Sequence, residues 1–205
     1  MGRLSKIKTG LTRHFADSTA LLTASNPVFS AFETLIAGMP DHVSQTARGI
    51  AAGLTYGGMG YLWGKGRDIS RKIFHINQQS RERVQTFHDA AYSMGFTSIV
   101  SPLLYFSSGT RDFNEIAWGT ASAALFGLVQ GPLLGYAVDV GRDLTGLGEC
   151  NRASYPQIVK KQKRMAKKGL AVLLAAASIG AMAGIYALTP NHGKETQSNY
   201  QINSK

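Results

Sequence analysis

Glu33 is the residue whose type and position most directly suggest chemistry. It lies in a stretch, residues 18–39, that carries no other charged side chain. An ionisable group at the centre of a bilayer costs ~2.5–3.5 kcal/mol, so such groups usually mark an ion or substrate pathway. A carboxylate here could take up and release a proton during transport. The alternative is a side chain that extends to the nearer aqueous surface.

Three aspartates and one arginine lie at the edges of apolar stretches and are further substrate-pathway candidates. Asp17 and Asp89 stand where helices are expected to begin, so capping of backbone N–H groups is the alternative to binding. Asp139 stands where a helix is expected to end, and the helix dipole opposes a carboxylate there. It therefore needs a cation such as Arg142. Arg48 opens the second apolar stretch.

Three hydroxyl side chains surround Pro102 and complete the candidate pathway: Ser98, Ser101 and Tyr105. A proline frees a backbone carbonyl, which is tolerated in a membrane where protein or a wet cavity satisfies it. Pro102 and Pro132 therefore predict two interrupted helices beside a cavity. The hydroxyls could meet a small zwitterion there, or hydrogen-bond to their own helix.

The remaining chemistry-bearing residues indicate neither an enzyme nor a cofactor. The five histidines have no metal-ligand spacing, and the single Cys150 excludes an internal disulfide and a cysteine-based zinc site. Nucleotide-binding loops, nucleophile elbows and zincin motifs are absent from the sequence. The net charge is +10, but no basic and aromatic surface pattern accompanies it, so nucleic acid is not an expected partner.

The charged residues are distributed very unevenly along the chain, and this pattern predicts the elements that hold the candidates. Five long stretches contain almost no charge, and about 20 mainly apolar residues suffice for a helix to cross a bilayer. We expect an all-α polytopic integral membrane protein with about five transmembrane helices, near residues 18–39, 48–64, 90–109, 116–139 and 169–189.

The basic residues predict the orientation of these helices, because Lys and Arg concentrate in cytoplasmic segments. Four precede the first span, six follow the second and eight follow the fourth, whereas only Arg48, Arg111, Lys194 and Lys205 lie on the other side. The N-terminus is therefore expected inside and the C-terminus outside, in a multi-pass protein of the cell inner membrane. The basic segments are expected to contact anionic lipid head groups.

Small residues recur at every fourth position in two of the spans and predict close helix packing. The two stripes are Gly49, Gly53 and Gly57, and Gly127, Gly131 and Gly135. Because four or five spans enclose little volume, a homo-oligomer is expected.

A weak internal repeat divides the chain further. Asp17 and Asp89 open the first and third spans, and Gly-Arg-Asp follows the second and fourth spans at residues 66–68 and 141–143. Such short matches also arise by chance. If the repeat is real, both halves start inside and form a parallel repeat. We therefore expect a four-span unit over residues 1–145, a basic linker (146–168), a fifth span (169–189) and a polar tail (190–205).

Three blocks of the sequence resemble the small bacterial L-alanine exporters, over roughly residues 15–145. The first contains Ala16-Asp17, Glu33, Gly38-Met39 and Arg48, and the second runs from Asp89-Ala-Ala-Tyr92 to Phe96, Ser98 and Gly109. The third is residues 131–142, GPLLGYAVDVGR. The proline of the family's Ser-Pro falls here at Ile99, with a Ser-Pro instead at Ser101-Pro102, and the fifth span is an addition.

The resemblance implies a four-span membrane core that exports L-alanine using the proton gradient. Its expected partners are a small neutral amino acid, protons and the lipid bilayer. Two alternatives stay open from the sequence. One is a membrane scaffold without transport, and the other is a small proton-coupled multidrug exporter.

Overall fold

The computed structural model describes residues 3–107 and 111–189. The predicted polar tail at 190–205 and Gly109 lie outside the described residues. The elements in chain order are α1 (Arg3–Ala31), η1 (Phe32–Ile36), α2 (Asp41–Leu54), η2 (Thr55–Met59), α3 (Gly60–Ile73), α4 (Glu82–Ser107), α5 (Phe113–Thr145), α6 (Gln157–Lys160) and α7 (Arg164–Leu188). The expectation of an all-α fold is confirmed for this part of the chain.

Each of the five expected spans overlaps a long helical segment, but all of these segments begin earlier than predicted, and the first ends at Ile36, three residues before the predicted end. α1 starts fifteen residues before residue 18, and α4 starts eight residues before residue 90. Charge-free length detects only the apolar middle of a helix, whereas Lys, Arg and Glu are themselves good helix formers. α5 has identifiable ends: the Asp112 side chain accepts from the amides of Asn114 and Glu115, and Gly146 closes the helix with a φ of 77°.

Two helices of the described residues, α5 and α7, are long and apolar enough to cross a membrane. α1 and α4 have comparable length but carry buried polar side chains within their apolar stretches. Asn26 and Ser30 of α1 are buried, as are Ser93 and Ser101 of α4. These residues lower the apolar character of the two helices.

The helix interruptions lie elsewhere than the prolines predicted. Pro102 and Pro132 sit inside the continuous helices α4 and α5. The chain instead widens into π-helical turns at η1 and η2, and the second contains Gly58 with a φ of 135°. Only glycine adopts that backbone angle without strain. π-helical turns frequently occur at functional sites, and the first of these two contains Glu33.

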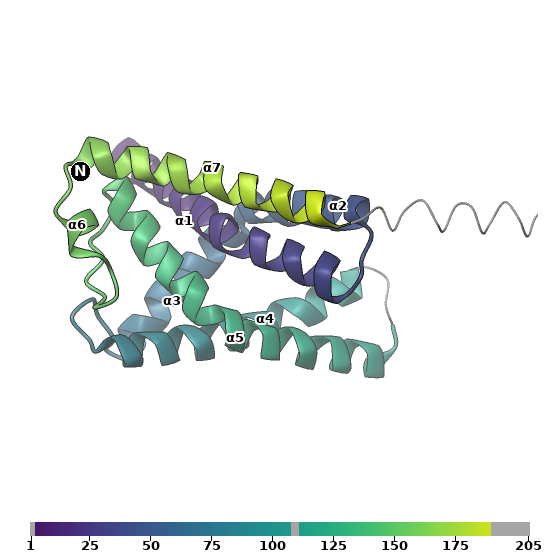
Figure 1. The fold of residues 1–205 in the computed structure, drawn as a ribbon. Coiled ribbons are helices and arrows are strands. Elements are labelled where there is room, and N and C mark those ends of the chain that lie inside the picture. Colours follow the sequence, from purple (N-terminus) through teal and green to yellow (C-terminus); the bar gives the residue numbers. More distant parts are fainter. Residues whose placement is uncertain (1–2, 108–110, 190–205) are drawn as a thin grey trace, which may run out of the picture.

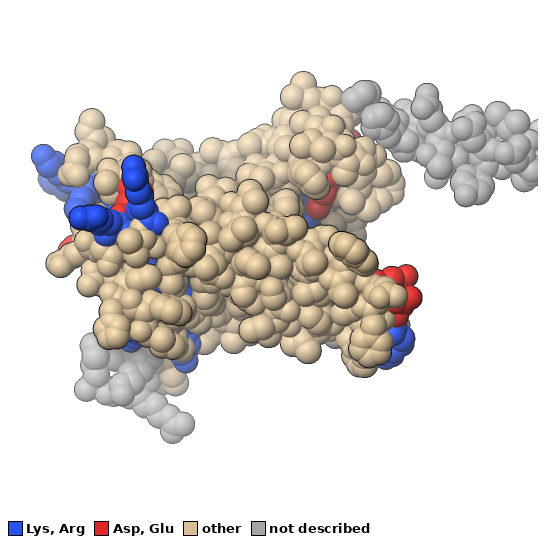
Figure 2. Space-filling view, turned by 90° about the horizontal axis from the view of Figure 1, so that it is seen from below, with Lys and Arg blue, Asp and Glu red and all other residues tan. Residues whose placement is uncertain are grey.

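The long helices run back and forth along one axis, with α1 and α7 side by side (Figure 1). We call the end where α1, α4 and α7 begin the basic end, and the opposite end, where α2 and α5 begin, the far end. Lys and Arg gather at the basic end of the face seen in Figure 2, and an uncharged belt separates the two ends.

Polar side chains are concentrated inside the helix bundle, and many large apolar side chains lie on its surface. Among the described residues, buried polar and charged side chains outnumber buried apolar ones, and the apolar core is small, built around Leu21, Trp63 and Val138. Large apolar side chains instead face outward, such as Val129, which is 76% exposed, and Val172, which is 69% exposed. A water-soluble domain would show the reverse distribution.

The two predicted glycine stripes differ in what they contact. A Cβ added to Gly127, Gly131 or Gly135 would lie within 2.8 Å of α4 atoms, so these glycines allow α5 to approach α4 closely. Gly49, Gly53 and Gly57 have no neighbouring atom within 4 Å of such a Cβ. The close packing predicted for Gly49, Gly53 and Gly57 does not occur within one chain, because this face of α2 and η2 points away from the other helices, and packing against another chain stays a prediction.

Candidate ionic site at the basic end

Five buried charged residues form the centre of the basic end. We call them the arginine–aspartate cluster: Arg67, Arg71, Arg152, Asp89 and Asp139. They come from α3, α4, α5 and the segment between α5 and α7. All are at most 7% exposed. Three guanidinium groups face two carboxylates, so the cluster carries one surplus positive charge.

Arg67 is the fully satisfied centre of this cluster. Its Nε and Nη2 donate to the two carboxylate oxygens of Asp89 across 2.8 and 3.0 Å. Its Nη1 and Nη2 donate to Asp139 across 2.9 and 2.8 Å. Burial opposes the charge, but the two carboxylates outweigh it and raise the pKa of Arg67.

Arg71 lies one helical turn further along α3 and is less well compensated. Its Nη2 donates to Asp89 across 3.0 Å and to Asp139 across 3.3 Å, but its buried Nε has no hydrogen-bond partner. Burial, followed by repulsion from Arg67, lowers the pKa of Arg71 below its ordinary value. A guanidinium stays protonated at physiological pH. The unpartnered Nε and the longer contacts with Asp139, at 3.3 and 3.5 Å, identify Arg71 as the arginine of the cluster with incomplete hydrogen bonding.

Arg152 reaches the cluster from the loop that follows α5. Its Nε donates to Asp139 across 2.9 Å and its Nη2 donates to Asp89. The loop is anchored on both sides of it: Cys150 is fully buried, and the Tyr155 hydroxyl donates to Asp143 across 2.7 Å. The segment expected as a basic linker therefore inserts a side chain into the core of the site.

A second ion-pair group, buried at Arg142 and Asp17 but partly exposed at Asp68 and Arg13, lies beside the cluster. Arg142 donates to both oxygens of Asp17 and, through Nη1, to Asp68 across 2.7 Å. Asp68 also pairs with Arg13 across 3.1 Å. Two arginines here face two aspartates, so this group is balanced.

A polar cavity of about 370 Å³ opens between the two groups at the basic end. Arg71 and Asp139 of the cluster line it, and so does Arg142 of the balanced group. Asp68 and Glu149 also line it, as do the cations Arg13 and Lys72. The cavity therefore presents an incompletely paired cation and several carboxylates to one small volume.

Glu33 lies at the far end and is neither solvent-exposed nor unpartnered. Arg48 Nη2 donates to its Oε1 across 2.6 Å, and Ser44 Oγ donates to its Oε2 across 2.7 Å. The hydroxyl of Tyr186 in α7 lies 3.0 Å from both Ser44 Oγ and Ser30 Oγ. The predicted pathway residues Glu33 and Arg48 therefore meet, and the fifth predicted span joins their network.

The three hydroxyl candidates of α4 do not line a common site. Ser98 donates to the Met94 carbonyl of its own helix across 2.8 Å. Ser101 is buried, and the Tyr105 hydroxyl donates to the Gly119 carbonyl of α5 across 3.3 Å. Ser98 thus adopts the alternative that the sequence left open, and Tyr105 ties two helices together.

Neither Asp17 nor Asp89 caps the N-terminus of a helix. Asp17 and Asp89 lie inside α1 and α4, well beyond the first turn, because both helices begin earlier than expected. Asp139 does have arginine partners, as predicted, but they are Arg67, Arg71 and Arg152. Arg142 pairs with Asp17 and Asp68 instead.

Most of the arginines in this site were not predictable as site residues from the sequence. Arg67 was visible only as the middle residue of the repeated Gly-Arg-Asp triplet, whereas Arg142 was also the expected partner of Asp139. No sequence signal marked Arg71 and Arg152 as site residues, because a basic residue beside an apolar span normally indicates only the orientation of that span in the membrane. Comparison with protein-family models, with curated proteins and with solved structures gave no match to this chain.

Proposed function

We propose that the chain is a multi-pass membrane transporter that exports a small neutral amino acid, with protons moving in the opposite direction. The five long helical segments would cross the bilayer, with the basic end in the cytoplasm. Two observations support this placement: large apolar side chains are exposed, and an uncharged belt lies between the two charged ends, with Lys and Arg gathered at the basic end.

The surplus positive charge beside the cavity is the observation that carries the proposal. Arg71 contacts Asp89 and Asp139, but three arginines share these two carboxylates and the buried Nε of Arg71 has no acceptor. A substrate carboxylate would supply that acceptor and balance the charge. The same cavity holds Asp68, Asp139 and Glu149, so an ammonium group could be accommodated a short distance away. A small zwitterion matches this arrangement. Because the resemblance is to alanine exporters, L-alanine is the first substrate to test.

The Glu33 network supplies the proton step in this proposal. Protonation of Glu33 from the outer side would remove its charge and weaken its hold on Arg48. The far end could then open, while the cavity at the basic end releases or reloads substrate. Loss of the proton to the cytoplasm would restore the pair, so each cycle would move a proton inward.

The two other functions left open by the sequence each have one favourable observation. An apolar groove between α1, α5 and α7 would suit a hydrophobic drug. The outward glycine stripe of α2 would suit the helix of a partner, as in a scaffold. Neither alternative uses the surplus cation at the basic end.

The decisive experiment measures uptake of labelled L-alanine into inside-out vesicles that have an acidic lumen and contain the purified chain. We expect accumulation that a protonophore abolishes. Arg71→Gln should reduce it at least tenfold, whereas Arg83→Gln, an exposed cation at the same end, should leave it unchanged. Equal helix content and detergent elution of the two variants would exclude misfolding. Normal uptake by Arg71→Gln would refute the site, and uptake of a lipophilic cation in place of alanine would favour the drug exporter.

A further inference from the structure

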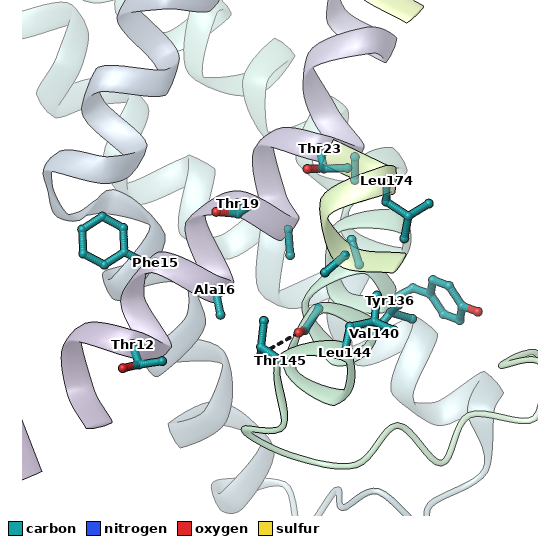
Figure 3. A pocket seen from close by; sticks show the side chains of 15 residues that line it. Thr12, Phe15, Ala16, Thr19, Thr23, Tyr136, Val140, Leu144, Thr145 and Leu174 are labelled. Atoms are coloured by element: carbon teal, nitrogen blue, oxygen red, sulfur yellow. Dashed lines mark hydrogen bonds between the residues drawn. The ribbon is translucent and has the colours of Figure 1, made fainter. Parts of the chain in front are cut away.

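A groove of about 560 Å³ runs between α1, α5 and α7 and shares no lining residue with the cavity of the ionic site (Figure 3). Small and apolar side chains form its walls, including Ala20 and Ala24 of α1, Val140 and Leu144 of α5, and Leu174 of α7. Two of its hydroxyls are already used within their own helices. Thr12 donates to the Lys8 carbonyl and Thr145 to the Gly141 carbonyl. The walls therefore suit a hydrocarbon chain.

Cations flank the basic end of the groove without lining it, and the Arg164 guanidinium lies against Gly146, next to the groove residue Thr145. Lys8 lies one helical turn before Thr12, and Arg164 and Lys167 share the face of α7 that carries Ala171. Lys167 pairs with Asp143 across 2.7 Å. Within the described residues, Lys8, Arg164 and Lys168 form no ion pair with a carboxylate.

The start of α7 adds to this positive field. Its first turn contains no acidic residue, and its N-cap residue, Lys163, makes no side-chain cap hydrogen bond. The unpaired backbone N–H groups of a helix N-terminus favour an anion, especially one with several oxygens. The cations and the helix start lie at the same end of the groove, where lipid phosphates would lie in the proposed membrane orientation.

We propose that the groove binds an acyl chain of an anionic phospholipid, with its phosphate held by Lys8, Arg164, Lys168 and the start of α7. This inference rests on the proposed membrane location but not on transport. The surrounding bilayer is as apolar as the groove, so the acyl chain alone would gain little by entering it. Selection must come from the head-group charge. A lipid without net charge would use the apolar groove but would gain little from the cations.

The experiment is native mass spectrometry of the purified, delipidated full chain with dioleoyl phosphatidylglycerol, dioleoyl phosphatidylcholine or glycerol 3-phosphate. We expect retention of phosphatidylglycerol well above phosphatidylcholine, and none of glycerol 3-phosphate. Lys8→Gln with Arg164→Gln should lower phosphatidylglycerol affinity roughly thirtyfold, the fold-change for two charges at ~1 kcal/mol each. The charge control is Arg81→Gln with Lys161→Gln, two exposed cations of the same end.

A second variant tests the groove separately from the charges. Ala24→Phe should fill it and reduce the retention of both lipids, whereas Ala177→Phe, on the exposed face of α7, should not. Thermal unfolding identifies any variant that fails to fold. Equal retention of the two lipids by the unmodified chain would overturn the proposal, as would equal effects of the site and control variants. Binding of glycerol 3-phosphate as tightly as the lipid would assign the cations to a phosphate site without the groove.

Discussion

Asp17 and Arg142, which are 125 residues apart, form an ion pair in which Nε donates to Oδ1 across 2.7 Å and Nη2 to Oδ2 across 2.6 Å. Arg67 holds Asp89 through the same atoms, across 2.8 and 3.0 Å. The weak repeat aligns Asp17 with Asp89 and Arg67 with Arg142. Each half therefore pairs its aspartate with the arginine of the other half, as a two-fold axis between the halves would require.

The first prediction is that the Asp17–Arg142 pair is strongly coupled in folding. Breaking a buried ion pair leaves an uncompensated charge, so Asp17→Asn and Arg142→Gln should each destabilise the protein by about 3 kcal/mol. The double variant should lose less than the sum, because the orphaned charge is then absent. Chemical unfolding in detergent of the unmodified chain, the two single variants and the double variant provides a double-mutant cycle. Arg81→Gln is the exposed control. Additive effects would refute the coupling.

The second prediction uses two glycines that the sequence does not distinguish. A Cβ on Gly135 would lie 2.0 Å from Asp89 Oδ2, so Gly135→Ala should displace that carboxylate and destabilise the protein by about 1–3 kcal/mol. Gly53→Ala meets no neighbour and should be neutral or stabilise α2 by up to ~1 kcal/mol. Thermal unfolding of both variants measures the difference. Destabilisation by Gly53→Ala would instead place a partner helix on that face.

The third prediction concerns proton coupling. Glu33→Gln keeps an acceptor for Ser44 but removes both the titration and the charge that holds Arg48. The variant should insert normally and exchange labelled alanine, yet lose uphill export driven by a proton gradient. Vesicle transport at matched expression measures both activities. Arg48→Gln, which leaves Glu33 able to titrate, is the comparison. Full uphill export by Glu33→Gln would exclude this residue as the coupling group and direct attention to Asp89 and Asp139.

The fourth prediction separates the loop after α5 from α7. A chain that ends at Gly148 lacks Arg152 and Tyr155, whereas a chain that ends at Gln162 keeps both and lacks only α7. The repeat predicts that α7 is dispensable for transport, so the longer truncation should retain alanine export. The shorter one should be less stable, because Asp139 and Asp89 lose a guanidinium. Export lost from both chains, although each inserts correctly, would refute a four-span core.

The fifth prediction is the membrane topology. A reporter active only in the cytoplasm should work when fused after Lys72 or Lys168. A reporter active only outside should work after Arg111 or at the C-terminus. The physical reason is the concentration of Lys and Arg at the basic end. A cytoplasmic C-terminus would mean that one of the five segments does not cross, and the 48–64 segment, which is interrupted at η2, would be the first to re-examine.

The all-helical architecture and the positions of its five long segments were predictable from sequence, because apolar length is a local property of the chain. So was the concentration of basic residues at one end. The early start of α1 was not, since residues 3–17 carry charges that obscure a helix without preventing it. The resulting error placed Asp17 at a helix end, although it lies in the helix interior.

Only the tertiary structure decided which charges meet. Arg67 reaches Asp139 across 72 residues, and Arg152 reaches Asp89 across 63, so no local spacing connects them. Tyr186 of α7 likewise contacts Ser30 and Ser44 of the Glu33 network from a distant part of the chain, so no local spacing predicts that contact either. Ion pairing depends on which helix faces come together, and the glycines at 127, 131 and 135 set that contact for α4 and α5. The sequence determined that charges lie beside apolar helices, and packing decided that three arginines share two aspartates.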